Sequence, residues 1–136
     1  VIEFNARFGD PETEVVLPRL KSDAIDVFMA VAYNEQPAAE WSEGATLGIV
    51  LASKGYPGDY TKGHVIRGVE NVASKVYHMG TAMKDGELVT NGGRVMFVVA
   101  EAPTLREAQQ KAMEDVERIE CDNLFHRNDI GAKAFR

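Results

Sequence analysis

The residues best suited to chemistry stand at the start of the chain, where Glu3, Asn5 and Arg7 alternate with apolar side chains. Side chains of a β-strand point alternately to its two faces, so this spacing predicts a strand over residues 1–8 with the three polar groups on one face. A carboxylate and an amide offer the oxygen ligands that Mg²⁺ prefers, and a guanidinium offers a planar fork to an anion. The trio is therefore suited to a metal–phosphate complex. The alternative is an exposed strand face without a ligand.

Two further carboxylates, Asp10 and Glu12, follow in the next few residues. A Gly-Asp-Pro sequence ends the strand, and Pro11 suits the first turn of a helix that we expect to reach about Leu17. Two interpretations stay open for the carboxylates. They orient an ammonium group of a substrate, or they stabilise the start of the helix, with Asp10 as its cap. Arg7 is also placed to form an ion pair with either of them.

A second helix is predicted over residues 23–33, with Ser22 as its N-cap. Its apolar residues recur at helical spacing and predict a buried stripe, which comprises Ile25, Phe28, Met29 and Ala32. The segment between residues 34 and 46 is rich in Pro, Ala and Gly and separates a helical part from a strand-rich part. We expect Trp41, inside this linker, to pack onto the core.

The sequence pattern of the rest of the chain predicts a sheet and one long helix. Strands are predicted at residues 46–52, 64–69, 75–83, 87–89, 94–100 and 124–126. Asp85-Gly86 predicts a hairpin. Asn91-Gly92-Gly93 predicts a second tight turn with positive φ, or a place where backbone N–H groups reach a substrate. A capping box, Thr104 with Glu107, opens a helix to about residue 119. The pattern as a whole indicates an α+β fold.

Composition excludes several classes of protein. Fifteen Lys and Arg against 21 Asp and Glu give a net charge of −6, which argues against a nucleic-acid partner. No apolar run approaches the length of a membrane span, and no signal peptide is visible, so we expect no membrane partner. Cys121 is the single cysteine, which leaves no internal disulfide and favours a reducing, cytoplasmic location. Nothing basic beside Cys121 suggests an activated thiolate.

Six segments carry a resemblance to a known family. They are residues 3–13 (E-F-N-A-R-F-G-D-P-E-T), 15–20 (V-V-L-P-R-L), 52–60 (A-S-K-G-Y-P-G-D-Y), 77–81 (Y-H-M-G-T), 90–95 (T-N-G-G-R-V) and 129–134 (D-I-G-A-K-A). Their order and sequences resemble the phosphoribosylamine–glycine ligases, a family of ATP-grasp enzymes, along essentially the whole chain. The resemblance implies roughly the last third of such an enzyme: residues 1–38 as the C-terminal end of the ATP-grasp domain, and residues 39–136 as a small antiparallel-sheet domain with a long helix.

The resemblance also implies a reaction and its participants. Family members join glycine to 5-phosphoribosylamine with ATP and Mg²⁺ or Mn²⁺, in de novo purine biosynthesis. By resemblance, Glu3 and Asn5 are the metal ligands, and Arg7 is the catalytic contact to the transferred phosphoryl group. Asp10, Glu12, Asn91 and Gly92 are then candidates for substrate binding. The N-terminal and ATP-grasp portions of the same chain are expected as partners, and the 136-residue chain alone is expected to be inactive.

Other interpretations remain. A non-catalytic interaction module, or an ATP-grasp ligase of a different substrate, would also carry the opening strand. His78 is expected to be a hydrogen-bonded structural histidine rather than a base. Without neighbouring strands, Ile2, Phe4 and Phe8 are expected to form an exposed apolar patch.

Overall fold

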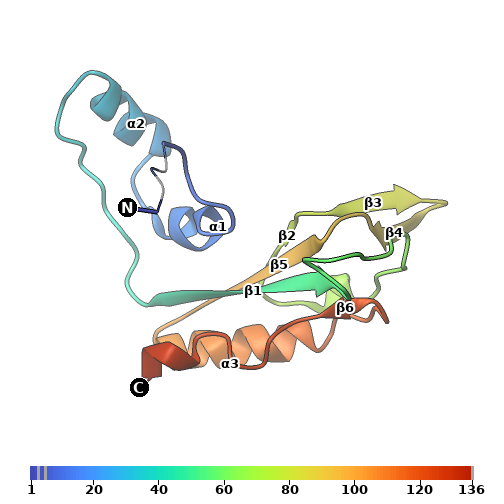
Figure 1. Cartoon of the computed structure of the whole chain (residues 1–136). Coiled ribbons are helices and arrows are strands. Elements are labelled where there is room, and N and C mark those ends of the chain that lie inside the picture. Colours follow the sequence, from blue (N-terminus) through green and yellow to red (C-terminus); the bar gives the residue numbers. More distant parts are fainter. Residues whose placement is uncertain (3, 5, 136) are drawn as a thin grey trace.

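The computed structural model describes residues 1, 2, 4 and 6–135 and is built around one antiparallel sheet (Figure 1). The sheet has four strands in the order β2-β5-β1-β6. Their bounds are β1 Ala45–Ser53, β2 Lys75–His78, β5 Arg94–Ala102 and β6 Leu124–Phe125. A separate two-stranded hairpin comprises β3 Thr81–Lys84 and β4 Glu87–Thr90. The predicted α+β class, with antiparallel strands and one long helix, is confirmed.

The core lies between the two long strands and helix α3 (Leu105–Val116), which covers one face of the sheet (Figure 1). On that face β1 and β5 place Ile49 opposite Val98, and both side chains are fully buried. The helix meets them with Ala108 and Ala112, which are also fully buried. Because alanine is small, the helix axis can approach the sheet closely and exclude water from the core.

Helix α3 begins as the sequence predicts. The Thr104 hydroxyl accepts a hydrogen bond from the Glu107 N–H, and the Glu107 carboxylate accepts one from the Thr104 N–H. The helix ends at Val116, three residues before the expected end. Short 3-10 helices at Val69–Asn71 and Ala132–Phe135 complete this part of the chain. Among the described residues, no helix has both the length and the apolar character that crossing a bilayer requires.

The two predicted turns have different outcomes. The β3–β4 hairpin is confirmed, and Asp85 and Gly86 take the positive φ angles of 52° and 82° that its tight turn requires. The segment Asn91-Gly92-Gly93 is no hairpin, because β4 pairs with β3 whereas β5 pairs with β1 and β2. Its backbone stays outside the positive-φ region. The glycines serve close approach instead: a side-chain carbon on Gly80 would lie 2.8 Å from the Cα atom of Gly92.

The other strand expectations were only partly right. Residues 46–52, 94–100 and 124–126 contain strands much as expected, and residues 75–83 form two strands rather than one. The predicted strand at 64–69 is wrong: only the isolated bridges Val65–Val89 and Arg67–Glu120 form there. A chain segment that meets two different neighbours in turn cannot build a continuous ladder with either.

The first 41 residues lie apart from the core of the sheet, and their regular elements are short helices. They contain α1 (Thr13–Val16), a 3-10 turn (Leu17–Arg19) and α2 (Ala24–Ala32). The predicted strand over residues 1–8 is wrong, because residues 1, 2, 4 and 6–8 are not extended along any partner. A strand needs a neighbour to bond its backbone. Ile2 and Phe4 are almost fully exposed, and Phe8 is 55% exposed, as expected for the apolar patch.

Helix α2 departs from the expectation in its cap and in its burial. Asp23, not Ser22, caps it, by accepting a hydrogen bond from the Ile25 N–H at 2.7 Å. The Ser22 hydroxyl bonds the returning chain instead, at Ala38 and Glu40. The apolar stripe is exposed rather than buried: Ile25 is 69%, Phe28 42% and Met29 44% accessible, and Ala32 is exposed. In this structure α2 lies away from the sheet (Figure 1).

Trp41 also differs from the expectation that it packs onto the core. It is 46% exposed and forms a backbone bridge with Leu20. The linker is therefore held to the N-terminal segment by its backbone, with Lys21 donating to the Glu40 carbonyl at 2.8 Å and Ser42 donating to the Arg19 carbonyl at 2.7 Å.

Candidate functional site

The candidate site is centred on Arg94, the first residue of β5. Its Nη1 donates to the backbone carbonyl of Asp10, and its Nη2 donates to the Asp10 carboxylate, both at 3.1 Å. The two residues are 84 positions apart. The contact fixes the loop before α1 against the start of β5. A second tie, from the Thr46 hydroxyl to the Val15 carbonyl at 2.7 Å, holds α1 over β1.

Arg94 lines two pockets. A polar pocket of about 350 Å³ is lined by Asp10, Glu14, His78, Met79 and Arg94. A largely apolar pocket of about 430 Å³ lies on the face of the sheet opposite α3. Its residues are Pro11, Gly48, Val50, Ala52, Tyr56, Arg94, Phe97, Phe125, His126, Arg127 and Ile130.

The apolar pocket depends on two glycines that make room for aromatic rings. A side-chain carbon on Gly48 would lie 2.1 Å from the Phe97 ring, and one on Gly93 would lie 2.2 Å from the Tyr56 ring. Both rings therefore lie against bare backbone. One of the lining residues, Arg127, forms a two-armed ion pair with Asp129, at 2.8 and 2.7 Å. This pairing raises the pKa of the Arg127 guanidinium and lowers the pKa of the Asp129 carboxyl.

A buried carboxylate on α3 holds the segment that precedes β2, the strand that carries His78. Asp115 on α3 is fully buried and accepts hydrogen bonds from the backbone N–H groups of Ala73 (3.2 Å) and Ser74 (2.8 Å), and from Arg118. Burial alone raises the pKa of Asp115, but the hydrogen bonds from Ser74 and Ala73 and the charge of Arg118 outweigh it, so the pKa is lowered overall. Asp115 thereby fixes the segment that leads into β2.

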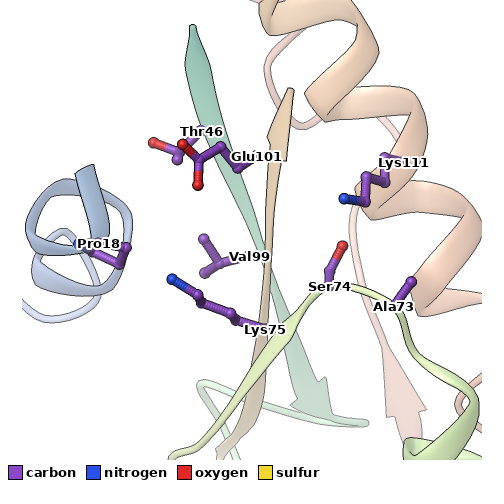
Figure 2. Close-up of a pocket in the computed structure, with 8 residues that line it drawn as sticks. All are labelled: Pro18, Thr46, Ala73, Ser74, Lys75, Val99, Glu101 and Lys111. Carbon is purple, nitrogen blue, oxygen red and sulfur yellow. The ribbon is translucent and has the colours of Figure 1, made fainter. Parts of the chain in front are cut away.

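A third pocket lies at the other end of β5, away from Arg94. Figure 2 shows Lys111 extending from α3 on one side, Lys75 pointing toward the Pro18 turn on the other, and Glu101 above them. Its charges are mixed, with Lys75 and Lys111 against Glu101. This pocket shares no residue with the two around Arg94.

Comparison with known proteins identifies the family. The model of the phosphoribosylglycinamide synthetase C domain matches residues 46–133. The chain belongs to the phosphoribosylglycinamide synthetase family. Proteins named phosphoribosylamine–glycine ligase are similar over 98% of this chain, at 55% identity in Halalkalibacterium halodurans and 47% in Vibrio parahaemolyticus. The chain spans about a third of their length, 32% in both cases.

A crystal structure of phosphoribosylamine–glycine ligase from Thermotoga maritima has the same architecture. It superposes on 96% of this chain with a TM-score of 0.85 at 34% sequence identity, and the match covers 33% of that chain. The antiparallel sheet with its helix is therefore the fold of this family's C-terminal domain.

Five of the six segments that carry the family resemblance meet around Arg94. Asp10 and Pro11 come from the first, Ala52 and Tyr56 from the third, and Met79 with His78 from the fourth. The fifth supplies Arg94 itself, and the sixth supplies Ile130. Segments spread over more than a hundred residues thus share one small region of the surface.

The predicted site residues are distributed unequally. Glu3 and Asn5 lie outside the described residues, so their role as metal ligands stays a prediction. Arg7 donates to the carbonyl of its neighbour Phe8 at 3.0 Å and is exposed. Asp10 is not the helix cap, because its carboxylate is bonded to Arg94. Glu12 occupies the cap position of α1 without a side-chain cap bond.

Asn91 and Gly92 lie against Gly80, in the connection between β2 and β3, and line neither pocket. The Asn91 N–H donates to the Gly80 carbonyl at 2.8 Å, and the Gly92 carbonyl accepts from the Ser53 hydroxyl at 2.8 Å. The Asn91 N–H is therefore already engaged within the fold, while its side chain is exposed. Their role in substrate binding stays a prediction.

Sequence reasoning did not select Glu14 and Arg94 as site residues. Arg94 stands in a quoted family segment directly after two glycines, which is a usable signal for a side chain at a crowded strand start. Glu14 gives no such signal, because a glutamate in a first helical turn is ordinary. His78 accepts or donates a hydrogen bond with the Thr81 hydroxyl at 3.0 Å, which fits the structural role expected for it. Within the described part of the chain, no three His, Cys, Asp or Glu side chains come together as a metal site would require.

Proposed function

We propose that this chain forms the C-terminal part of a ligase that joins glycine to 5-phosphoribosylamine, with ATP converted to ADP and phosphate, in purine biosynthesis. Membership of the family, together with relatives that carry this ligase's name over 98% of the chain, is the observation that carries the proposal. The meeting of the family segments around Arg94 supports it, because a substrate site is a physical reason for distant segments to share one surface.

The chemistry fits the residue types at the start of the chain. In the proposed reaction the glycine carboxylate attacks the terminal phosphate of ATP to give glycyl phosphate, and the amine of phosphoribosylamine then displaces phosphate. Both partners of the first step are anions, so positive charge must hold them together. Glu3 and Asn5 have the oxygen donors that suit Mg²⁺ or Mn²⁺, which would neutralise phosphate charge. Arg7 would contact the phosphoryl group during its transfer.

The remaining assignments concern the substrates and the missing part of the enzyme. Asp10 and Glu12 would orient an amine, and Asn91 and Gly92 would face the substrate. Residues 1–38 would complete an ATP-grasp domain, and residues 39–136 would form the C-terminal domain, in a cytoplasmic enzyme. Since the chain spans a third of its relatives, the other two thirds would supply the nucleotide site, and the fragment would be inactive alone.

The test follows ADP release by the intact polypeptide with glycine, phosphoribosylamine, ATP and Mg²⁺. We expect release to require both substrates and to fall by at least a hundredfold in Glu3→Gln, because a neutral amide is a much poorer Mg²⁺ ligand. Glu70→Gln removes an exposed carboxylate at Val69–Asn71 and serves as the matched control. No release from a folded intact protein would refute the proposal and favour a non-catalytic module. Release with a different amino acid would favour a ligase of another substrate.

A further inference from the structure

We infer that Arg94 is a positioning residue for the proposed reaction. From the start of β5 it holds the loop before α1 at Asp10, and through that loop it fixes the place of Arg7, the proposed contact to the transferred phosphoryl group. This role deepens the proposed function and rests on it for the reaction. Arg94 needs no contact with a substrate, because it acts through the loop.

Arg94 contacts Asp10 through both its backbone and its side chain. One arm of the guanidinium donates to the Asp10 carbonyl and the other donates to the Asp10 carboxylate, both at 3.1 Å. A bond to the carboxylate alone would leave the backbone free to move, because the side chain can rotate. Two bonds from one planar group fix both parts, and a lysine ammonium lacks this fork. The contact therefore sets the position of the loop as well as the orientation of one carboxylate.

Arg94 is also the one distant hydrogen-bond partner of this loop within the described part of the chain. The other hydrogen bonds of the described residues 6–12 stay inside residues 7–16. Such local bonds preserve the shape of a turn but not its position relative to the sheet. Although α1 is tied to β1 through the bond from Thr46 to Val15, the loop in front of α1 depends on Arg94.

A register shift in the sheet turns Arg94 toward the loop. The pairing of β1 with β5 changes between Leu51 and Ala52, and Val95 is an extra residue in β5. In an unbroken strand Arg94 would share the face covered by α3 with Met96, two residues further on. With the extra residue it lies opposite Ala52, on the other face, and reaches the loop. Bulges re-aim neighbouring side chains in this way.

The backbone from which Arg94 extends is itself held tightly. The buried Ser53 donates to the Gly92 carbonyl through its hydroxyl and to the Gly93 carbonyl through its N–H, both at 2.8 Å. On the other side, a side-chain carbon on Gly80 would lie 2.5 Å from the Arg94 carbonyl oxygen, so the two backbones are in close contact. A side chain can position another segment only from a base that does not move, and these contacts provide that base.

The first test uses the intact polypeptide and the variant Arg94→Lys, which keeps the charge but cannot form both bonds. We expect kcat for ADP release to fall about tenfold or more, because a displaced Arg7 contacts the phosphoryl group poorly, with the KM for ATP within about twofold. Arg67→Lys makes the same change in a different ion pair, with Glu87 at 2.9 Å, and should leave both constants unchanged. A kcat of Arg94→Lys equal to that of the wild type would overturn the inference. Should Arg94→Lys not fold, Arg94→Gln takes its place with the same expectations.

A double variant separates positioning from stability. If Arg94 acts through Arg7, then Arg94→Lys should lower kcat further by less than about twofold once Arg7→Lys is present, because the group to be positioned is already lost. A residue that only stabilised the fold would lower the activity by the same factor in either background. Equal factors in the two backgrounds would therefore overturn the inference.

Amide exchange separates failure of the inference from failure of the proposed function. Should the intact wild type release no ADP, the proposed function fails, but hydrogen–deuterium exchange at Thr13 still tests the hold on the loop. The Thr13 N–H donates to the Gly9 carbonyl at 3.1 Å, directly beside Asp10. We expect it to exchange severalfold faster in Arg94→Lys than in the wild type, and at the wild-type rate in Arg67→Lys. Equal exchange in all three proteins would overturn the inference.

Discussion

The sheet domain and the N-terminal segment of this chain are stabilised to very different extents. In the sheet domain, Ile49, Val95, Val98 and Ala100 have no accessible surface, and α3 closes over them. In the N-terminal segment, four apolar side chains of α2 are between 42% and 69% exposed, namely Ile25, Phe28, Met29 and Val31. The sheet domain therefore contains its own core, whereas the apolar face of α2 stays largely exposed, with the tilted Phe8–Phe28 ring pair at 5.7 Å as a contact on it.

The contact between the two regions is narrow and polar. Among the described residues it includes the Arg94–Asp10 pair, the Thr46–Val15 hydrogen bond and the packing of α1 on β1. Exposed ion pairs and single hydrogen bonds contribute little to stability. The region that gathers the family segments therefore lies where a stable unit meets a weakly held one, and each prediction below tests that contrast.

The largest expected effect compares two isoleucines. Ile49→Ala removes a fully buried side chain and should lower the free energy of unfolding by about 3 kcal/mol, because it leaves a cavity that the strands cannot close. Ile25→Ala, on the exposed face of α2, should change it by less than about 0.5 kcal/mol. Urea denaturation followed by circular dichroism measures both. Similar losses at the two sites would show that α2 is packed in solution.

A second effect concerns the backbone crossing behind the site. Gly80→Ala would place a carbon 2.5 Å from the Arg94 carbonyl oxygen, so we expect a loss of about 2 kcal/mol as the two backbones separate. Gly58→Ala is the matched control, since its nearest atom would be 3.2 Å away. The melting temperatures of the two variants, measured by thermal unfolding, test this expectation. Equal melting temperatures would contradict a close approach of the two backbones at Gly80.

The third effect depends on pH. Asp115→Asn removes the charge that holds Ala73 and Ser74, and should cost about 2 kcal/mol at pH 7. Because folding lowers the pKa of Asp115 below its ordinary value of 3.8, the stability it contributes is complete above that value and is lost as the pH falls through the folded pKa. The difference in free energy of unfolding between wild type and variant should therefore become smaller below about pH 4. Urea titrations at a series of pH values measure it, with Glu114→Gln as an exposed control.

The smallest effect lies at the contact between the regions. Trp41 is the single tryptophan and belongs to the N-terminal segment, so its fluorescence reports on that segment while circular dichroism follows the whole chain. We expect the fluorescence change at lower urea concentration than the circular dichroism change. Arg94→Gln should destabilise the N-terminal segment by less than about 1 kcal/mol, since the partner of Arg94, Asp10, is 59% exposed. The fluorescence transition should therefore move to slightly lower urea concentration while the circular dichroism transition stays in place. Coincident transitions in the wild type would mean that the two regions unfold as one.

The elements that were predicted correctly are those whose sequence pattern lies within a few neighbouring residues. The capping box of α3, the apolar run of β5 and the Asp85-Gly86 turn carry their information within a few residues, and all three formed as expected. The strand over residues 1–8 has an equally clear alternation but needs a neighbouring strand, and the described residues there have none. The stripe on α2 failed for the same reason, because helical spacing shows which residues can be buried but not what buries them.

The candidate site was predicted less well than the fold. The family segments were recognised one by one, yet their meeting point could not be, because the Arg94–Asp10 contact joins residues 84 positions apart and no local pattern encodes it. Glu14 was passed over because its distinguishing property, a buried oxygen without a donor, exists only once α1 lies over the sheet. The Asn91-Gly92-Gly93 segment was correctly noticed for its glycines but assigned the wrong geometry, since close approach and positive φ both favour glycine.

The order of the strands has a consequence for how the chain folds. The central pair, β1 and β5, aligns nine-residue strands that are separated by the whole of residues 54–93, whereas β3 and β4 are joined by a two-residue turn. Closing a long loop costs entropy before any contact compensates it, so folding must wait for β1 to find β5. The β3–β4 hairpin can form within microseconds, but productive collapse should take milliseconds or longer. During that interval β5, the most apolar strand, lacks its longest partner along one edge and is the segment most exposed to association with other chains.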